Sequence, residues 1–133
     1  MVARVAREEI DSGRCLVSSV TATELLVGAR GDAGLNALGT LLEALPVVAV
    51  DREVATLAGF MGAYARRNGA TIPLADLLIA ATAVHIDIPL LTCDQDFARG
   101  RRLAPGGRRG RTRGSGAELW QRFALHSASV PSA

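Results

Sequence analysis

The amino-acid sequence predicts an α/β domain in which a short parallel sheet is flanked by helices in three layers. Apolar residues recur at helical spacing in several segments, and short apolar or β-branched runs lie between them. This alternation is typical of the class. Hydrophobic residues make up 49% of the 133 residues, and a chain of this size buries roughly two thirds of its unfolded surface around one core. The sequence therefore predicts a single domain.

The first half of the chain contains three predicted helices and one predicted strand. In order, these are a helix over 1–12, a strand over 15–20, a helix over 21–29 and a helix over 35–45. Gly13 and Gly31 are predicted to end the first two helices, because glycine readily adopts the backbone conformation that follows a helix. Pro46 closes the third helix, because proline cannot continue it.

The second half repeats the alternation up to residue 92. The predicted elements are a strand over 47–50, a helix over 51–67, a helix over 73–84 and a strand over 90–92. Asp51 is predicted to cap its helix, and Arg66 and Arg67 in the last turn complement the helix dipole. The predicted buried stripe of this helix is Val54, Leu57, Ala58, Met61 and Ala65. Pro73 suits the first position of the next helix.

Residues 99–133 differ in composition from the rest of the chain. Residues 1–98 carry seven arginines against twelve acids, a net charge of −5, whereas residues 99–133 carry eight arginines against one acid, a net charge of +7. We expect a domain over 1–98 followed by a disordered, Arg/Gly-rich tail over 99–133. An apolar patch at 119–125 predicts one or two helical turns. The basic tail indicates a polyanionic or acidic partner, or a solvated end.

The two cysteines and the hydropathy pattern indicate where the protein works. Cys15 and Cys93 are too few and too far apart for a disulfide framework or a zinc site, so we expect both to be reduced and buried. No stretch has the layout of a signal peptide. No apolar run approaches the ~20 residues that span a bilayer. We therefore expect a cytoplasmic protein with no membrane contact.

Several acids lie near the predicted carboxyl edge of the sheet. Glu24 begins the helix after the first strand, Asp76 opens an otherwise apolar helix, and Asp94 and Asp96 follow the strand over 90–92. Because ligands gather at the carboxyl ends of strands in open α/β sheets, we expect Glu24, Asp76 and Asp94 to converge. Two carboxylates about 4 Å apart repel by roughly 4 kcal/mol at an effective dielectric constant of about 20. A hard cation relieves that repulsion, and oxygen-only ligands favour Mg²⁺ or Mn²⁺.

A divalent cation held by carboxylates suits phosphodiester hydrolysis. Such an ion neutralises the phosphate, lowers the pKa of water and stabilises the leaving oxygen. The competing patterns are missing from the sequence: it contains no Ser/His/Asp or Cys/His arrangement for nucleophilic catalysis and no phosphate-cradling GxxxxGK[ST] loop. The acids therefore predict a hydrolytic metal site.

Each acid also has a simpler structural interpretation. Thr21 and Glu24 have the spacing of a capping box, in which the glutamate accepts a hydrogen bond from a backbone N–H at the helix start. Asp76 suits the first turn of any helix, where the dipole stabilises an acid by about 0.3–1 kcal/mol. Asp94 suits a turn or a helix cap. His85, in the last turn of a helix, has a structural role on the same grounds.

Three segments, TATELLVGA, PLADLLIAATA and LLTCDQDF, resemble the later acidic motifs of PIN-domain ribonucleases. Their spacing and flanks are most similar to the VapC-type toxins of bacterial toxin–antitoxin pairs, and the resemblance covers residues 1–98. It implies a Mg²⁺- or Mn²⁺-dependent endoribonuclease that cuts RNA, is often a homodimer, and is held inactive by a cognate VapB-type antitoxin.

The resemblance also implies roles for individual residues. By position, Glu24, Asp76 and Asp94 correspond to metal ligands. Asp96 corresponds to an accessory acid, and Thr92 supplies a hydroxyl near the phosphate or metal. All of these residues except Glu24 lie between residues 76 and 96.

In two places the sequence departs from the family pattern. The family opens with a strand that ends in an aspartate, which is its first metal ligand, whereas this sequence opens at the following helix. Asp11 lies at the far end of that helix and is no substitute. The Arg/Gly run over 99–133 does not resemble the short strand usual in the family. We therefore expect an N-terminally incomplete domain, with its first strand missing and its activity impaired.

Three functions are compatible with these observations. The leading one is a metal-dependent ribonuclease toxin. The alternative is a non-catalytic PIN-like protein that binds an antitoxin or a second subunit. The third is a nucleic-acid-binding module that works through the Arg/Gly tail, whose affinity would fall steeply with salt.

Overall fold

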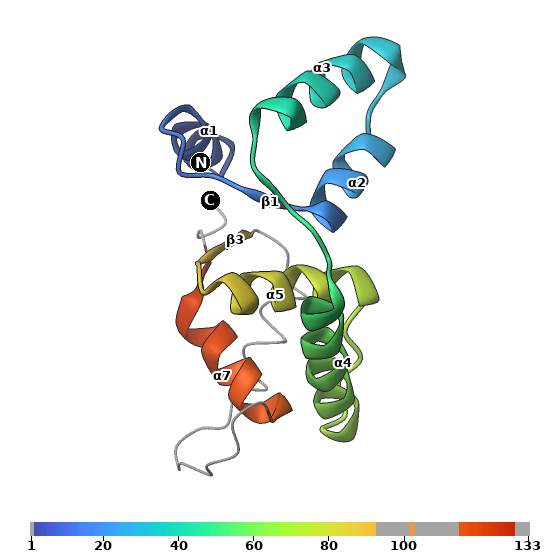
Figure 1. Cartoon of the computed structure of the whole chain (residues 1–133), viewed down its shortest axis with the longest axis vertical. Coiled ribbons are helices and arrows are strands. Elements are labelled where there is room, and N and C mark those ends of the chain that lie inside the picture. The colour runs from blue at the N-terminus through green and yellow to red at the C-terminus, as the bar shows by residue number, and fades with distance from the viewer. Residues whose placement is uncertain (1, 93–101, 103–114, 130–133) are drawn as a thin grey trace. The chain divides into compact units, whose positions relative to one another are not determined.

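The protein is a mostly helical α/β structure with short parallel strands, as the sequence predicts. The computed structural model describes residues 2–92, 102 and 115–129. The chain divides into two compact units, Met1–Val50 and Asp51–Ala133. Figure 1 shows the course of the chain through both.

The first unit contains three helices and a pair of very short strands. Its elements are α1 (Val2–Asp11), β1 (Val17–Ser18), α2 (Ser19–Val27), α3 (Gly31–Ala44) and β2 (Val47–Val48). The two strands pair in parallel, with Val17 opposite Val47. Both strands are shorter than predicted, and β1 ends at Ser18 because that residue is also the N-cap of the following helix.

Helix α2 begins at Ser19, two residues before its predicted start. The Ser18 side chain accepts a hydrogen bond of 3.0 Å from the Thr21 backbone N–H, and its hydroxyl lies 2.9 Å from the Thr21 hydroxyl. Ser18 is therefore the N-cap, and the capping box predicted at Thr21 and Glu24 is wrong. Gly28 ends α2, whereas Gly31, predicted to end it, begins α3 with a φ of 67°.

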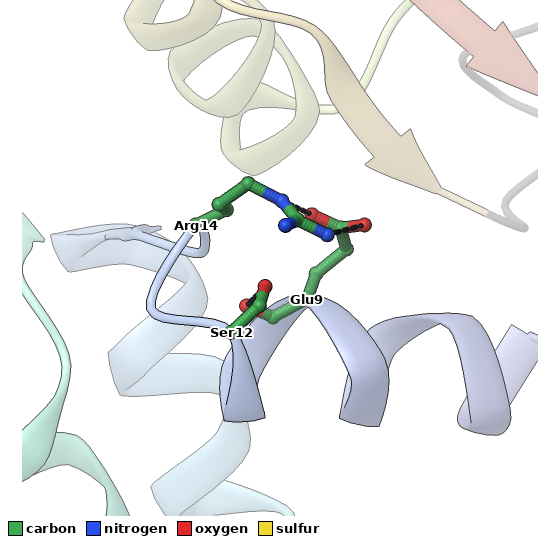
Figure 2. Close-up of polar contacts among 3 residues, drawn as sticks. All are labelled: Glu9, Ser12 and Arg14. Atoms are coloured by element: carbon green, nitrogen blue, oxygen red, sulfur yellow. Dashed lines mark hydrogen bonds and ion pairs between the residues drawn. The ribbon is translucent and has the colours of Figure 1, made fainter.

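The end of α1 is held by polar contacts around residue 9 (Figure 2). Gly13 has a φ of 70° and ends the helix, as predicted. The Arg14 guanidinium donates from Nε and Nη2 to the two carboxylate oxygens of Glu9, at 3.0 and 3.1 Å. The Ser12 hydroxyl donates to the Glu9 backbone carbonyl at 2.9 Å. These contacts return the chain from α1 towards β1.

The second unit contains the remaining helices and a second pair of strands. Its elements are α4 (Arg52–Arg67), α5 (Leu74–Ile86), β3 (Leu90–Thr92), α7 (Gly116–His126) and β4 (Ser127–Ser129). Helices α4, α5 and α7 pack against one another (Figure 1). Strand β3 pairs in parallel with β4. The strand predicted over 90–92 and the cap predicted at Asp51 are confirmed, since the Asp51 carboxylate accepts from the Val54 N–H at 2.9 Å.

All buried hydrophobic residues of the described chain lie in the second unit. They are Val54, Ala58, Met61, Ala65, Ile72, Leu77, Ile79, Ala80, Ala81, Ala83, Val84, Leu119, Trp120 and Phe123. The stripe predicted for α4 is confirmed at four positions, while Leu57 is half-buried. In the first unit, Leu25, Leu35 and Val27 are exposed, Val27 to 81%. None of the described helices is long and apolar enough to cross a membrane.

Helix α7 and strand β4 correct the prediction of a disordered tail over 99–133. The predicted one or two turns are an 11-residue helix, and Trp120, Phe123 and Leu119 are among the largest fully buried side chains. The Trp120 indole N–H donates to the Met61 carbonyl of α4 at 3.0 Å. Residues 103–114 lie outside the described part of the chain. The domain boundary predicted at residue 98 stays a prediction.

Candidate metal-binding acids of the second unit

Asp76 lies in the first turn of α5, which begins at Leu74 after Pro73. It is the only acid of this helix and is half-buried, next to Leu77, which is 8% exposed. Most of the helix is apolar, and every residue from Ile79 to Val84 is buried. Burying a carboxylate is costly unless it is hydrogen-bonded or paired with a positive charge. Asp76 makes a polar interaction within the chain, so its partial burial does not by itself require a cation, although its carboxylate oxygens could bind one.

Helices α4 and α5 approach each other closely at Gly62 and Leu77. A Cβ atom built on Gly62 of α4 would be 2.7 Å from Leu77 Cδ1, well inside normal carbon–carbon contact. Cδ1 is the end of a flexible side chain, so a larger residue at position 62 would require the Leu77 side chain to shift. Leu77 is adjacent in sequence to Asp76, so the Gly62 contact lies beside the acid in the first turn of α5.

The far end of α5 is held by α4 and α7. The Arg122 guanidinium of α7 donates to the Val84 carbonyl at 2.9 Å and lies 3.6 Å from the Asp87 carboxylate. Asp87 caps the helix in the left-handed conformation, with a φ of 56°. His85 Nδ1 lies 3.6 Å from the Glu53 carboxylate at the start of α4. The structural role predicted for His85 is consistent with this contact.

Glu24 lies on α2 in the first unit and is exposed. Ser18 performs the capping role that had been the simpler explanation for Glu24. The Glu24 side chain makes no hydrogen bond or ion pair with another residue that the structure describes. The glutamate is therefore accessible to a ligand, and no described residue is paired with its carboxylate.

The predicted convergence of Glu24, Asp76 and Asp94 stays a prediction. Glu24 and Asp76 belong to different units, and Asp94 and Asp96 lie outside the described residues, as does Cys93. Within residues 2–92, 102 and 115–129, no three His, Cys, Asp or Glu side chains form a group that could hold a metal ion.

Two local observations bear on the fit of a metal. The donors at Glu24 and Asp76 are carboxylate oxygens, which suit hard cations such as Mg²⁺ and Mn²⁺ rather than zinc. Strand β3 ends at Thr92, two residues before Asp94. Since β3 pairs in parallel with β4, the two strands end at the same edge, where ligands gather in α/β folds.

The sequence did not indicate the residues that hold α5 in place. Gly62 and Arg122 were not singled out for their contacts with α5, nor Trp120 for its hydrogen bond to α4. Each of these contacts is with a residue far away in the chain. The apolar spacing of Leu119, Trp120 and Phe123 was visible, but it predicted only a turn or two. Cys15, predicted to be buried, is half-buried and free.

Comparison with known proteins identifies one family. The family model described as the PIN domain matches residues 2–103. A search of curated proteins finds no match.

Proposed function

Because the chain belongs to the PIN-domain family, whose members are generally nucleases, we propose that it is a metal-dependent endoribonuclease. We further assign it to the toxin component of a type II toxin–antitoxin pair, of the VapC type. The observation that carries this proposal is the match over residues 2–103, which includes all the predicted acids: Glu24, Asp76, Asp94 and Asp96. Asp76, half-buried beside apolar residues, is the best-supported of them.

Each acid has a stated task in the proposed reaction. Glu24, Asp76 and Asp94 would hold Mg²⁺ or Mn²⁺ through carboxylate oxygens. The bound ion would supply charge neutralisation at the phosphate and a lowered pKa for the attacking water. Asp96 would act as an accessory acid, and the Thr92 hydroxyl would contact the phosphate or the ion.

The test is RNA cleavage by the purified protein with Mg²⁺ or Mn²⁺, compared with the Asp76→Asn variant. Asparagine keeps the size of the side chain and removes its charge. Asp32→Asn is the matched control, because Asp32 is also an acid in the first turn of a helix, α3, and is exposed. Any general effect of removing a helix-dipole acid is therefore present in both variants.

We expect Asp76→Asn to lower the cleavage rate by about 100-fold or more, as loss of a group acting on the transition state does. Asp32→Asn is expected to cleave RNA at the wild-type rate. EDTA is expected to stop cleavage by both the wild type and Asp32→Asn. Equal cleavage by Asp76→Asn and wild type would remove Asp76 from the mechanism. Cleavage that persists in EDTA would exclude the metal.

The proposed partners are a VapB-type antitoxin and a second copy of the chain. The first unit supports this assignment, because Leu25, Val27 and Leu35 are exposed there. Covering these side chains with a partner would remove apolar surface from water, which favours association. Co-purification with the product of the adjacent reading frame, combined with light scattering, would test both partners.

The same exposed residues favour a second candidate, a non-catalytic PIN-like protein that binds an antitoxin or a second subunit. It predicts a stable complex and no RNA cleavage under any metal condition. Asp76→Asn leaves complex formation unchanged under this candidate, whereas Val27→Asp, at an 81% exposed position, weakens it. Metal-dependent cleavage by the wild type would exclude it.

A further inference from the structure

Asn68 is the C-cap of α4, and Gly69 follows it; no other asparagine of the chain precedes a glycine. Both residues are exposed. Gly69 has a φ of 78°, in the left-handed region that favours glycine after a helix. A Cβ atom built on Gly69 would meet nothing within 4 Å, so its backbone is uncrowded. The end of α4 therefore places an unhindered peptide nitrogen next to a side-chain amide.

An asparagine followed by glycine can lose its side-chain amide without an enzyme, and asparagine is among the chemically labile residues. The Gly69 nitrogen attacks Asn68 Cγ: an N–Cγ bond forms, the Cγ–Nδ2 bond breaks, and ammonia leaves with the proton that the Gly69 nitrogen gives up. The product is a five-membered succinimide ring. Water then adds to one of the two ring carbonyls. Addition at Cγ gives aspartate, and addition at the Asn68 backbone carbonyl gives isoaspartate.

The closed helix end holds both reacting groups away from this geometry. The Asn68 side-chain Nδ2 donates to the Tyr64 carbonyl at 2.8 Å, and the Gly69 N–H donates to the Arg66 carbonyl at 3.1 Å. Asn68 has a ψ of 19°, which places its own backbone nitrogen, rather than its Cβ, beside the Gly69 nitrogen. Since the succinimide ring requires Cβ in that place, the last turn must open before the ring can close.

Opening of this turn is a local event. Residues 66–69 are all exposed, whereas Ala65 before them and Ile72 after them are buried. The opening breaks the hydrogen bonds at Asn68 and Gly69, but it removes no buried apolar side chain from the core. Exposed segments with few buried contacts open at a lower free energy than the whole protein unfolds. The reactive geometry is therefore accessible from a chain that is otherwise folded.

We infer that Asn68 is a deamidation site of the folded protein, and that opening of the last turn of α4 controls the rate of the reaction. The product carries a negative charge at the C-terminal end of the helix, where the dipole disfavours an acid. It also lacks the amide donor to the Tyr64 carbonyl. Deamidation therefore weakens the helix end that the asparagine holds. The inference does not depend on the proposed function.

The first experiment incubates the full-length protein at mildly alkaline pH and follows each asparagine by peptide mass spectrometry. Asn36 is the internal control, because it is the other asparagine of the chain, is exposed, and precedes Ala37 within α3. We expect the mass change of an amide converted to a carboxylate at Asn68 and none at Asn36. A parallel sample unfolded in urea should react about tenfold faster or more.

Two outcomes of this experiment would overturn the inference. If Asn68 reacts in urea but stays unchanged in the folded protein, it is not a deamidation site of the folded chain. If the two samples react at the same rate, the helix end does not control the reaction.

The second experiment compares two full-length variants at Arg66. Arg66→Gly and Arg66→Ala both remove the exposed guanidinium, but glycine favours a helix much less than alanine does. We expect Arg66→Gly to deamidate about two- to fivefold faster than Arg66→Ala. Arg52→Gly, at the other end of α4, should react at the wild-type rate. Circular dichroism checks that each variant is folded. Equal rates for the two Arg66 variants would refute control by opening of the last turn.

Discussion

Glu9 and Arg14 form the best-defined ion pair of the first unit (Figure 2). The hydrogen bonds and the charge of Arg14 lower the pKa of the Glu9 carboxyl below its ordinary value of 4.5. Burial raises the pKa of the neighbouring Cys15 thiol, and the negative charge of Glu9 raises it further. Because the charge of Glu9 acts on Cys15, a change in the Glu9–Arg14 ion pair should change the pKa of the Cys15 thiol.

The pH dependence of this pair follows from the direction of the shift. Glu9 binds its proton less tightly in the folded than in the unfolded chain, so its contribution to stability is present above pH 4.5 and is lost as the pH falls through the lowered pKa. We predict that Arg14→Gln raises the pKa of Glu9 towards 4.5 and removes this contribution. A carboxyl NMR titration measures the change. Because the pair is exposed, salt should weaken it, and a salt-independent pKa would contradict the assignment.

Individual residues of the candidate site could be predicted only where the signal is local. The first-turn position of Asp76 follows from Pro73 and the apolar run after it, and the structure confirms it. The contact of Gly62 with Leu77 could not be predicted, because Gly59 looks the same in the sequence. What distinguishes the two is Leu77, a residue that folding brings to one glycine and not to the other.

Among the elements, helix starts were predictable where one polar side chain clearly precedes the helix. Asp51 is such a case, and its capping hydrogen bond to Val54 is present. Ser18 was missed because it lies in a β-branched stretch, where strand and cap compete for the same residue. Helix α7 was underestimated because short helices gain most of their stability from tertiary packing, which periodicity does not reveal. Its buried Trp120 and Phe123 supply that packing.

We predict that Asp51→Ala destabilises the second unit by about 1 kcal/mol, because the Val54 N–H loses its side-chain acceptor. Asp51→Asn keeps an acceptor oxygen and should lose a smaller amount. Urea unfolding followed by circular dichroism gives both values. Equal losses in the two variants would show that the charge of Asp51 matters rather than its capping hydrogen bond.

A buried hydrogen bond from the Trp120 indole N–H to the Met61 carbonyl ties helix α7 to α4. We predict that Trp120→Phe destabilises the protein by about 1–3 kcal/mol, since it removes this donor and leaves a space beside Phe123, whose ring meets the indole edge-on at 5.5 Å. Gln121→Ala, at an exposed position of the same helix, is the control and should change stability by less than about 0.5 kcal/mol. Similar effects of both changes would contradict the docking role of Trp120.

At the scale of the whole molecule, the two units differ in how they are stabilised. Every buried hydrophobic residue for which the structure describes the side chain lies between Val54 and Phe123, whereas in the first unit Ser18 is the only buried residue among residues 4 and 7–50. Apolar burial is the main favourable term in folding. The second unit therefore has a core of its own, whereas residues 4 and 7–50 of the first unit, as far as the structure describes them, contribute no buried apolar side chain.

We predict that a fragment comprising residues 51–133 folds alone, and that a fragment comprising residues 1–50 does not. Circular dichroism and amide-proton dispersion measure both. The full-length protein provides the reference. Its cooperative unfolding transition should be reproduced by the fragment comprising residues 51–133. A folded, cooperatively melting 1–50 fragment would show that the first unit has stabilising contacts beyond its buried surface.

The packing of α7 also has a consequence during synthesis. A ribosome makes α4 and α5 well before Leu119, Trp120 and Phe123, yet these three side chains complete the core around both helices. Until the chain extends past residue 123, the nascent helices leave apolar surface uncovered, which makes them targets for chaperones and proteases. A ribosome that stalls before this point would thus release a product unable to close its core.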